Sequence, residues 1–190
     1  LCKFDDQRVT MASQIAGADE TVSSLYSVKS EQATMLSFDT YNYLVHYFGQ
    51  PQGSMADDPN GTLGGDYEFV ISDATADRIE LKGKKYGNRI VMKAFSADQT
   101  WKQYLTRIKK VEDDAFFYEY DLRMDGLYTG QMLRSNYTFI VTYYDEVGKV
   151  HQKTVPFMFT TDGMRFHEPV TIDGQTMQNF VWKNEEISFV

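Results

Sequence analysis

The chain has 190 residues, of which 42% are hydrophobic and 15% aromatic, so it can bury a sizeable core and is not a disordered segment. Its formal net charge of -8 disfavours general binding to nucleic acid and to anionic lipid surfaces, both of which attract basic proteins. The single cysteine, Cys2, excludes a disulfide within the chain and a structural zinc site built from several thiolates.

Short β-strands account for the first part of the chain. Three runs bounded by polar turns are "LCKF" (1–4), "RVTMAS" (8–13) and "SLYSV" (24–28). The run 66–75 alternates in the manner of a strand, and 77–95 predicts a hairpin whose turn lies between Gly83 and Gly87. Residues 66–95 are therefore expected to form three consecutive antiparallel strands.

One amphipathic helix is predicted near 97–113. Its apolar side chains repeat at the spacing of an α-helix, at Trp101, Tyr104, Leu105, Ile108 and Val111. Lysine and arginine occupy the opposite side, and Ser96 stands where an N-cap residue would, with Gln99 three residues on. This pattern indicates a surface helix that covers a core, rather than one that binds a partner.

Strand patterns resume after the helix and continue to the end. The runs cover 115–124, 136–145, 149–160, 164–172 and 178–190. Asp-Gly pairs at 125–126, 162–163 and 173–174 predict tight turns, and Pro156 and Pro169 predict an edge position or a bulge. The expected fold class is mainly β, with antiparallel strands forming a sandwich or a partly open barrel.

The domain organisation has two interpretations. The first is a single β-rich domain over residues 1–190. The second is a pair of similar β units, at about 1–95 and 116–190, that flank the helix. It depends on a faint likeness between "FDDQRVTM" near the start and "YYDEVGKV" near the end, since each turns at an acidic pair and leads to an apolar strand.

Catalytic and metal-binding patterns are weak. His46, His151 and His167 have none of the close spacings of zinc ligands, and no G-x-S-x-G nucleophile motif occurs. We therefore expect no enzymatic activity, no metal and no cofactor. Cys2 could be taken for a lipid-attachment cysteine, but the strand pattern that continues through it disfavours this interpretation.

Acidic residues leave two alternatives open. Asp39, Asp66 and Glu68 could serve a glycoside hydrolase, which needs two carboxylates at a set separation. The segment 55–66, "MADDPNGTLGGD", gathers oxygen-bearing side chains that suit calcium, at Asp57, Asp58, Asn60 and Asp66. It lacks the spacing of an EF-hand, so a polar turn is the favoured interpretation.

The window 35–51, "MLSFDTYNYLVHYFGQP", also has two interpretations. It forms a structural corner if Asn42 and Asp39 cap a short helix at 43–48 above a packed apolar face of Leu44, Tyr47 and Phe48. It forms a ligand-binding patch if tyrosine faces stack on a sugar while polar groups bind its hydroxyls. The candidate ligand-binding residues are Asp39, Tyr41, Asn42, His46, Asp66 and Tyr67.

Three pieces of sequence carry a family resemblance. They are "FDDQRVTMAS", "MLSFDTYNYLVHYF" and "GGDYEFVISDATADRIELKGKKYGNRIVM", of which "SFDTYN", "GGDYEF" and "LKGKKYGN" are the most specific. Together they resemble a domain family of unknown function found in predicted secreted lipoproteins of Gram-negative gut bacteria. The resemblance covers roughly residues 3–95 and is looser beyond the helix.

The resemblance implies an extracytoplasmic address, at the cell surface or in the periplasm, and a link to loci for polysaccharide or nutrient uptake. It also implies a lipoprotein leader and a further strand before Leu1, so we expect a truncated N-terminus and a lipid anchor in the full-length protein. The expected function is a non-catalytic binding module for a glycan or a partner surface protein. A structural or assembly protein without a small ligand is the alternative, and no nucleic-acid partner is expected.

Overall fold

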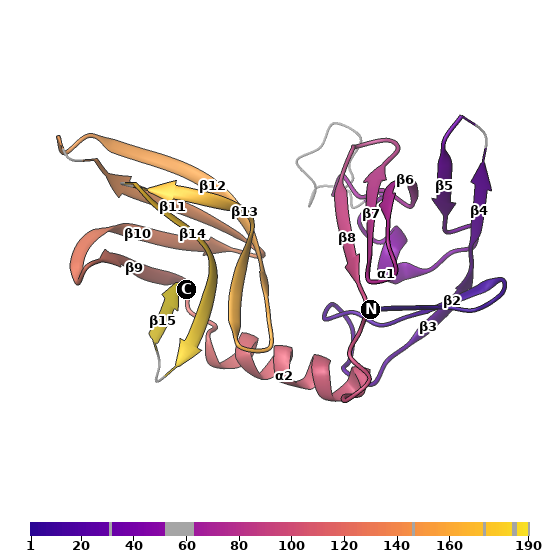
Figure 1. Ribbon diagram of the computed structural model, residues 1–190. Coiled ribbons are helices and arrows are strands. Elements are labelled where there is room, and N and C mark those ends of the chain that lie inside the picture. Colours follow the sequence, from indigo (N-terminus) through magenta and orange to yellow (C-terminus); the bar gives the residue numbers. More distant parts are fainter. Residues whose placement is uncertain (31, 52–62, 146, 173, 184–185, 190) are drawn as a thin grey trace. The chain divides into compact units, whose positions relative to one another are not determined.

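The computed structural model describes the chain except residues 31, 52–62, 146, 173, 184–185 and 190 (Figure 1). Strands make up 53% of the described residues, and only one of the two described helices is longer than six residues. Every strand pair among the described residues is antiparallel. The predicted fold class, mainly β with antiparallel strands, is therefore confirmed.

The chain divides into two compact units, Leu1–Lys102 and Gln103–Val190. The boundary lies near the start of helix α2 (Trp101–Asp114), so most of this helix belongs to the second unit. The units differ in architecture: the first holds a 3-stranded and a 5-stranded sheet, and the second holds a 7-stranded sheet.

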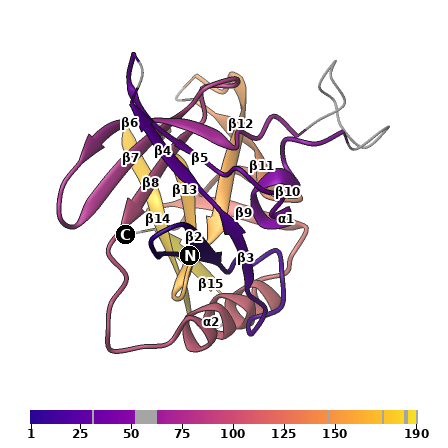
Figure 2. The same cartoon turned by 90° about the vertical axis from the view of Figure 1, so that its right-hand side faces the viewer.

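The described residues of the first unit form eight short strands in two sheets. The small sheet contains β1 (Cys2–Phe4), β2 (Arg8–Met11) and β3 (Val22–Leu25), in that order. The larger sheet contains β4 (Ser27–Ser30), β5 (Thr34–Ser37), β6 (Glu68–Ala74), β7 (Arg78–Gly83) and β8 (Arg89–Lys93), in that order. Figure 2 shows β3 running on into β4, so the chain changes sheets at Tyr26. The three strands predicted within 66–95 are β6, β7 and β8.

Both sheets of the first unit contribute to one core. Val9 and Met11 of β2 pack in the same cluster as Leu36 of β5, Phe69 of β6 and Leu81 of β7. Phe69 is only 1% exposed, and burying a side chain of this size contributes about 2–3 kcal/mol. The first unit is therefore a small sandwich, one of the two arrangements that the sequence predicts.

The second unit is an up-and-down meander. Its strands lie side by side in chain order. They are β9 (Glu119–Met124), β10 (Leu127–Ser135), β11 (Thr138–Tyr144), β12 (Val150–Phe159), β13 (Gly163–Ile172), β14 (Gln175–Lys183) and β15 (Glu186–Phe189). This seven-stranded sheet curves into a half-barrel, as Figure 1 shows.

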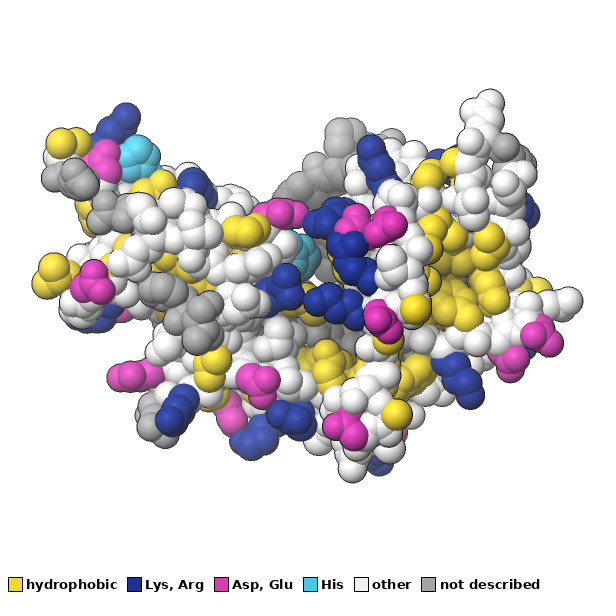
Figure 3. Space-filling view, in the orientation of Figure 1, with side chains coloured by type: hydrophobic (Ala, Val, Ile, Leu, Met, Phe, Trp, Pro, Cys, Tyr) yellow, Lys and Arg dark blue, Asp and Glu magenta, His cyan; other side chains and the backbone are white. Residues whose placement is uncertain are grey.

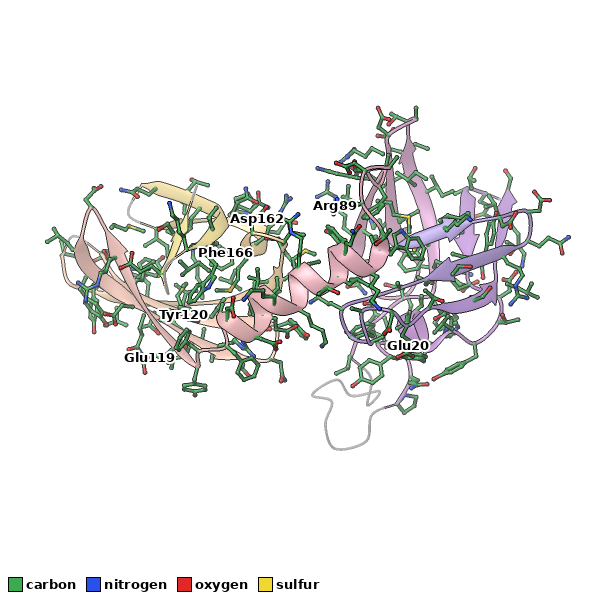
Figure 4. All side chains as sticks on the ribbon, turned by 90° about the horizontal axis from the view of Figure 1, so that it is seen from below. Glu20, Arg89, Glu119, Tyr120, Asp162 and Phe166 are labelled. Carbon is green, nitrogen blue, oxygen red and sulfur yellow. The ribbon has the colours of Figure 1, made fainter. Side chains whose placement is uncertain are left out.

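The inside of the curved sheet is a packed core. Phe139 stacks on Phe157 with ring centroids 4.2 Å apart, and Phe166 meets Phe180 edge-on at 4.7 Å. The space left among the side chains of Met132, Phe139, Met164, Phe166, Phe180 and Ile187 is too small for a water molecule. Figure 4 shows Tyr120 and Phe166 inside the curve and Glu119 outside it, as strand alternation requires. The space among these six side chains therefore does not hold a ligand.

Helix α2 has the predicted apolar face but starts later than predicted. Leu105 and Ile108 are buried, as their spacing requires. The helix begins at Trp101 rather than near residue 97. The hydroxyl of Ser96 donates to the carboxylate of Asp98 at 2.5 Å, and residues 97 and 98 form a turn ahead of the helix.

The turn and bulge predictions of the second half are confirmed in part. The prediction at Pro156 is wrong, because this residue lies in β12, between β11 and β13, and the register between β11 and β12 continues to it without a shift. Asp125 and Gly126 both have positive φ, 49° and 80°, as a two-residue hairpin turn requires. Pro169 lies within the register shift between Arg165 and Val170 where β13 pairs with β14. Strand β10, in contrast, is absent from the sequence-based prediction, because Gly130 at its centre weakens the strand pattern.

Candidate functional site

Helix α1 (Tyr43–His46) forms a corner after β5, and Asn42 is its N-cap. The side-chain oxygen of Asn42 accepts a hydrogen bond from the backbone N–H of Leu44 at 3.1 Å, and its amide donates to Ser24 Oγ at 3.1 Å. Asn42 is 0% exposed, so both bonds lie in the interior. The predicted cap is confirmed at Asn42, whereas the helix is shorter than the predicted 43–48.

Two residues that precede Asn42 tie the corner to the small sheet. The backbone N–H of Asp39 donates to the carbonyl of Leu25 at 3.1 Å, and the N–H of Leu25 donates to Thr40 Oγ1 at 2.8 Å. The N-cap of α1 is Asn42, so Asp39 does not cap the helix. Leu44 packs below the helix as predicted, but Tyr47 and Phe48 are 39% and 37% exposed.

Three rings from this region meet at the surface and form what we call the Tyr–His–Tyr surface: Tyr41, His46 and Tyr67. His46 stacks on Tyr67 with centroids 4.9 Å apart and an interplanar angle of 19°, and it lies 5.4 Å from Tyr41. Tyr41 is 63% exposed and Tyr67 is 44% exposed. The structure thus brings together three of the six candidate ligand-binding residues.

The imidazole of His46 is held by the backbone of the helix cap. Its Nδ1 atom lies 2.9 Å from the carbonyl oxygen of Asn42 and 3.2 Å from the backbone nitrogen of Asn42. The hydroxyl of Tyr41 donates to the side-chain oxygen of Gln50 at 3.3 Å. These contacts give the Tyr–His–Tyr surface a defined geometry before any ligand binds.

Asp66, a fourth candidate, is buried and bound to the turn between β7 and β8. Its Oδ1 accepts from the backbone N–H groups of Lys85 at 2.7 Å and Tyr86 at 3.0 Å. Its Oδ2 accepts from the backbone and side-chain nitrogens of Asn88, at 3.3 and 2.9 Å. Burial raises the pKa of Asp66, but the hydrogen bonds outweigh burial, so the pKa lies below its ordinary value.

The carboxylates proposed for hydrolysis have separate partners. Asp66 is bound to the β7–β8 turn, and Glu68 pairs with Lys84 at 3.2 Å. Asp39 is exposed, and the neighbouring hydroxyls of Ser27 and Ser37 lower its pKa. None of these contacts links one of the three carboxylates to another.

Metal ligands do not converge in the described residues. No group of three or more His, Cys, Asp or Glu side chains there could hold a metal ion. His151 instead stacks on Tyr143 and lies 2.9 Å from the carboxylate of Asp145. Of the calcium candidates, Asp57, Asp58 and Asn60 lie outside the described residues, and Asp66 has the four bonds given above.

A pocket of about 370 Å³ opens in the first unit. Its walls are Cys2, Met11, Phe38, Leu44, Val45, Phe48, Leu63, Gly64, Gly65, Asp66, Phe69, Asn88, Ile90 and Met92. Tyr41, His46 and Tyr67 of the Tyr–His–Tyr surface do not line this pocket. The sequence-based prediction missed this pocket. The one local signal for the pocket is that Ile90 and Met92, two residues apart on β8, point to the same face of the strand.

Apolar side chains also reach the surface outside the pocket. Figure 3 shows them gathered on the first unit above β2 and β3. In the second unit the consecutive residues Phe116, Phe117 and Tyr118 are 65%, 49% and 72% exposed. The guanidinium of Arg134 lies 3.9 Å from the ring centroid of Phe116, a cation–π arrangement.

No helix in the described part of the chain is long and apolar enough to cross a membrane. A family model described as Domain of unknown function (DUF4302) matches residues 1–184. The match extends beyond the region 3–95 and spans both compact units. No curated protein and no solved structure matches the chain.

Proposed function

We propose a function for this chain from its surface chemistry, because the chain belongs to the DUF4302 family, whose description names no activity. The proposed function is non-catalytic binding of a glycan, with the Tyr–His–Tyr surface stacking on a sugar ring. The observation that carries it is the stack of His46 on Tyr67 beside an exposed Tyr41.

Sugar rings present an apolar face of C–H groups and an edge of hydroxyls. An exposed aromatic ring matches the first, because its face is apolar and carries a negative quadrupole that attracts C–H hydrogens. Tyr41 and Tyr67 expose 63% and 44% of their surface, so both rings are accessible to a ligand. Because the helix cap already fixes His46, less conformational entropy is lost on binding.

Polar groups beside the rings can bind the hydroxyls. The Tyr41 hydroxyl and the Gln50 amide already form a hydrogen-bonded pair at this surface. Asn42 and Asp66, in contrast, are buried and hydrogen-bonded to protein groups, so we leave them out of the proposed contacts. Asp39 remains an exposed acceptor on the same segment.

The proposed setting is outside the cytoplasm. It is supported by the resemblance of "SFDTYN", "GGDYEF" and "LKGKKYGN" to pieces of predicted secreted lipoproteins of gut bacteria. On this proposal a lipid anchor in the full-length protein holds the module at the cell surface or in the periplasm. Its ligand is then a glycan that reaches that compartment.

Affinity electrophoresis against a panel of soluble polysaccharides tests the proposal. We expect Tyr41→Ala and Tyr67→Ala each to weaken retention about tenfold, equivalent to about 1.4 kcal/mol, with little change in Tm. Tyr47→Ala is the matched control, since Tyr47 is 39% exposed on the same segment but outside the stacked rings. Equal retention of all variants, or no retention of the native chain by any polysaccharide, contradicts glycan binding at this surface.

An assembly role is the second candidate, and the exposed run Phe116, Phe117 and Tyr118 favours it. Such a run of apolar surface is typical of protein-binding sites. Sedimentation of the native chain alone at increasing concentration tests self-assembly. Substituting Phe117 with Ser is then expected to abolish any oligomer, whereas Tyr41→Ala is expected to leave it intact.

A further inference from the structure

The pocket of the first unit has the size of a small-molecule site. Its volume of about 370 Å³ lies within the roughly 300–1,000 Å³ typical of ligand pockets. An engineered cavity of about 150 Å³ already takes up benzene. At about 30 Å³ for each water-sized atom, this pocket holds about a dozen non-hydrogen atoms.

The lining of the pocket is almost wholly apolar. Phe38, Leu44 and Phe69 form buried walls, and Met11 and Met92 add flexible thioether side chains that adapt to irregular ligands. Polar ligands would lose their hydration here without gaining hydrogen bonds. The lining therefore selects molecules of low polarity.

The two polar side chains in the wall are bonded to each other. Asn88 donates its side-chain N–H to Asp66 Oδ2 at 2.9 Å and also donates to the carbonyl of Gly64 at 2.5 Å. The Asp66 carboxylate keeps its negative charge because its pKa is lowered. A ligand carboxylate beside it would be repelled, so the pocket disfavours fatty acids and other organic anions.

The pocket opens to solvent through apolar side chains. Leu63 is 46% exposed, and Phe48 and Ile90 are each 37% exposed. A ligand that covered these three side chains would remove further apolar surface from water, at about 25 cal/mol for each Å². The rim and the interior therefore favour the same class of ligand.

We infer that this pocket is a binding site for an uncharged, apolar small molecule of about a dozen non-hydrogen atoms, such as a medium-chain alcohol or a fused aromatic compound. The inference is independent of glycan binding, because Tyr41, His46 and Tyr67 do not line the pocket. Either site can fail experimentally without the other.

Fluorescence titration of the full chain with 1-naphthylamine, an uncharged dye of about a dozen non-hydrogen atoms that matches the size of the pocket, tests the inference. Saturable dye binding is expected, with displacement by 1-decanol. Displacement by decanoate should require about tenfold more competitor, because the carboxylate meets Asp66. Absence of dye binding, or equal competition by the alcohol and the acid, overturns the assignment.

Strand β8 supplies a matched pair of variants. Ile90 and Val91 are adjacent and each 37% exposed, but only Ile90 lines the pocket. Ile90→Asp places a charge at the rim and should weaken dye binding about tenfold or more, whereas Val91→Asp should leave it unchanged. Equal effects of the two variants overturn the assignment.

Cys2 gives a readout that needs no variant. It is the only cysteine of the chain and lines the pocket, and burial raises the pKa of its thiol. Alkylation of the native chain by iodoacetamide is therefore expected to be slow and to slow further, about fivefold, under saturating 1-decanol. An alkylation rate that 1-decanol leaves unchanged contradicts occupation of this pocket.

Discussion

The carboxylate of Asp66 fills the space that any side chain at Gly83 would need. A Cβ atom at Gly83 would lie 1.9 Å from Asp66 Oδ2 and 2.2 Å from Asp66 Cγ. Gly83 ends strand β7, and the carboxylate passes over it to reach the amides of Lys85 and Tyr86. Asp66 and Gly83 are thus complementary parts of one turn.

Gly83→Ala is expected to destabilise the first unit by about 3 kcal/mol. The carboxylate cannot move aside cheaply, because the N–H groups of Lys85, Tyr86 and Asn88 hold it in place. Urea unfolding monitored by circular dichroism measures the loss. Gly17→Ala is the control, since its nearest contact would be an ordinary 3.5 Å, and a similar loss there would contradict the steric explanation.

The same pair predicts non-additive energetics. Asp66→Ala removes the atoms with which a side chain at position 83 would clash. Asp66→Ala combined with Gly83→Ala should therefore cost less than the sum of the single changes, by about 1–2 kcal/mol. Unfolding of the two single variants and the double variant measures this coupling, and strict additivity would show that the carboxylate is not what excludes a side chain.

Asp66→Asn tests the charge of the carboxylate. The variant keeps one acceptor oxygen and replaces the other with an NH2 group, so two of the four N–H donors lose their acceptor, and we expect a loss of about 2–3 kcal/mol near neutral pH. Glu68→Gln should cost less than about 1 kcal/mol, because it removes only the surface ion pair with Lys84. Equal losses in the two variants would contradict a special role for Asp66.

The pH dependence of stability has a definite sign at Asp66. Its pKa in the folded chain lies below the unfolded value of about 3.9, so its stabilising contribution is fully present above that pH. The contribution disappears as the pH falls through the lower, folded pKa. The difference in unfolding free energy between the native chain and Asp66→Asn should therefore shrink below about pH 4, and thermal unfolding across this range measures it.

Comparing Asn42→Ala with Tyr41→Ala distinguishes residues that stabilise this corner from residues proposed to bind a ligand. Loss of a helix cap typically costs about 1–2 kcal/mol, and here it also leaves the buried Ser24 hydroxyl without its amide donor. Tyr41→Ala, one residue earlier and 63% exposed, should change the unfolding free energy by less than about 0.5 kcal/mol. Thermal unfolding of both variants distinguishes the structural role of Asn42 from the proposed binding role of Tyr41. Similar losses of unfolding free energy would show that Tyr41 also stabilises the fold.

Local patterns predicted the elements that depend on neighbouring residues. Asp125 and Gly126 form the predicted turn, and Leu105 and Ile108 form the buried face of α2. The predicted start of that helix is wrong, because the hydroxyl of Ser96 bonds to Asp98 instead of capping the helix. Strand β10 depends on pairing with β9 and β11, which the pattern around Gly130 does not reveal.

The candidate site was less accessible to prediction, because its contacts are distant in sequence. Asn42 was recognised as a cap, but its bond to Ser24 joins residues 18 positions apart. "GGDYEF" and "LKGKKYGN" stood out separately, yet only the fold shows that Asp66 of the first binds the turn in the second. The pocket draws its walls from many short segments, so no single stretch predicts it.

Strand β9, at one end of the seven-stranded sheet, has a consequence for aggregation. An edge strand presents unpaired backbone groups to which a strand of another molecule can add. On β9 the exposed side chains are Glu119, Asp121 and Arg123, and the last two form an ion pair at 2.9 Å. A docking strand would have to desolvate these charges. The acidic and basic groups of β9 thus disfavour edge-to-edge growth at this end of the half-barrel.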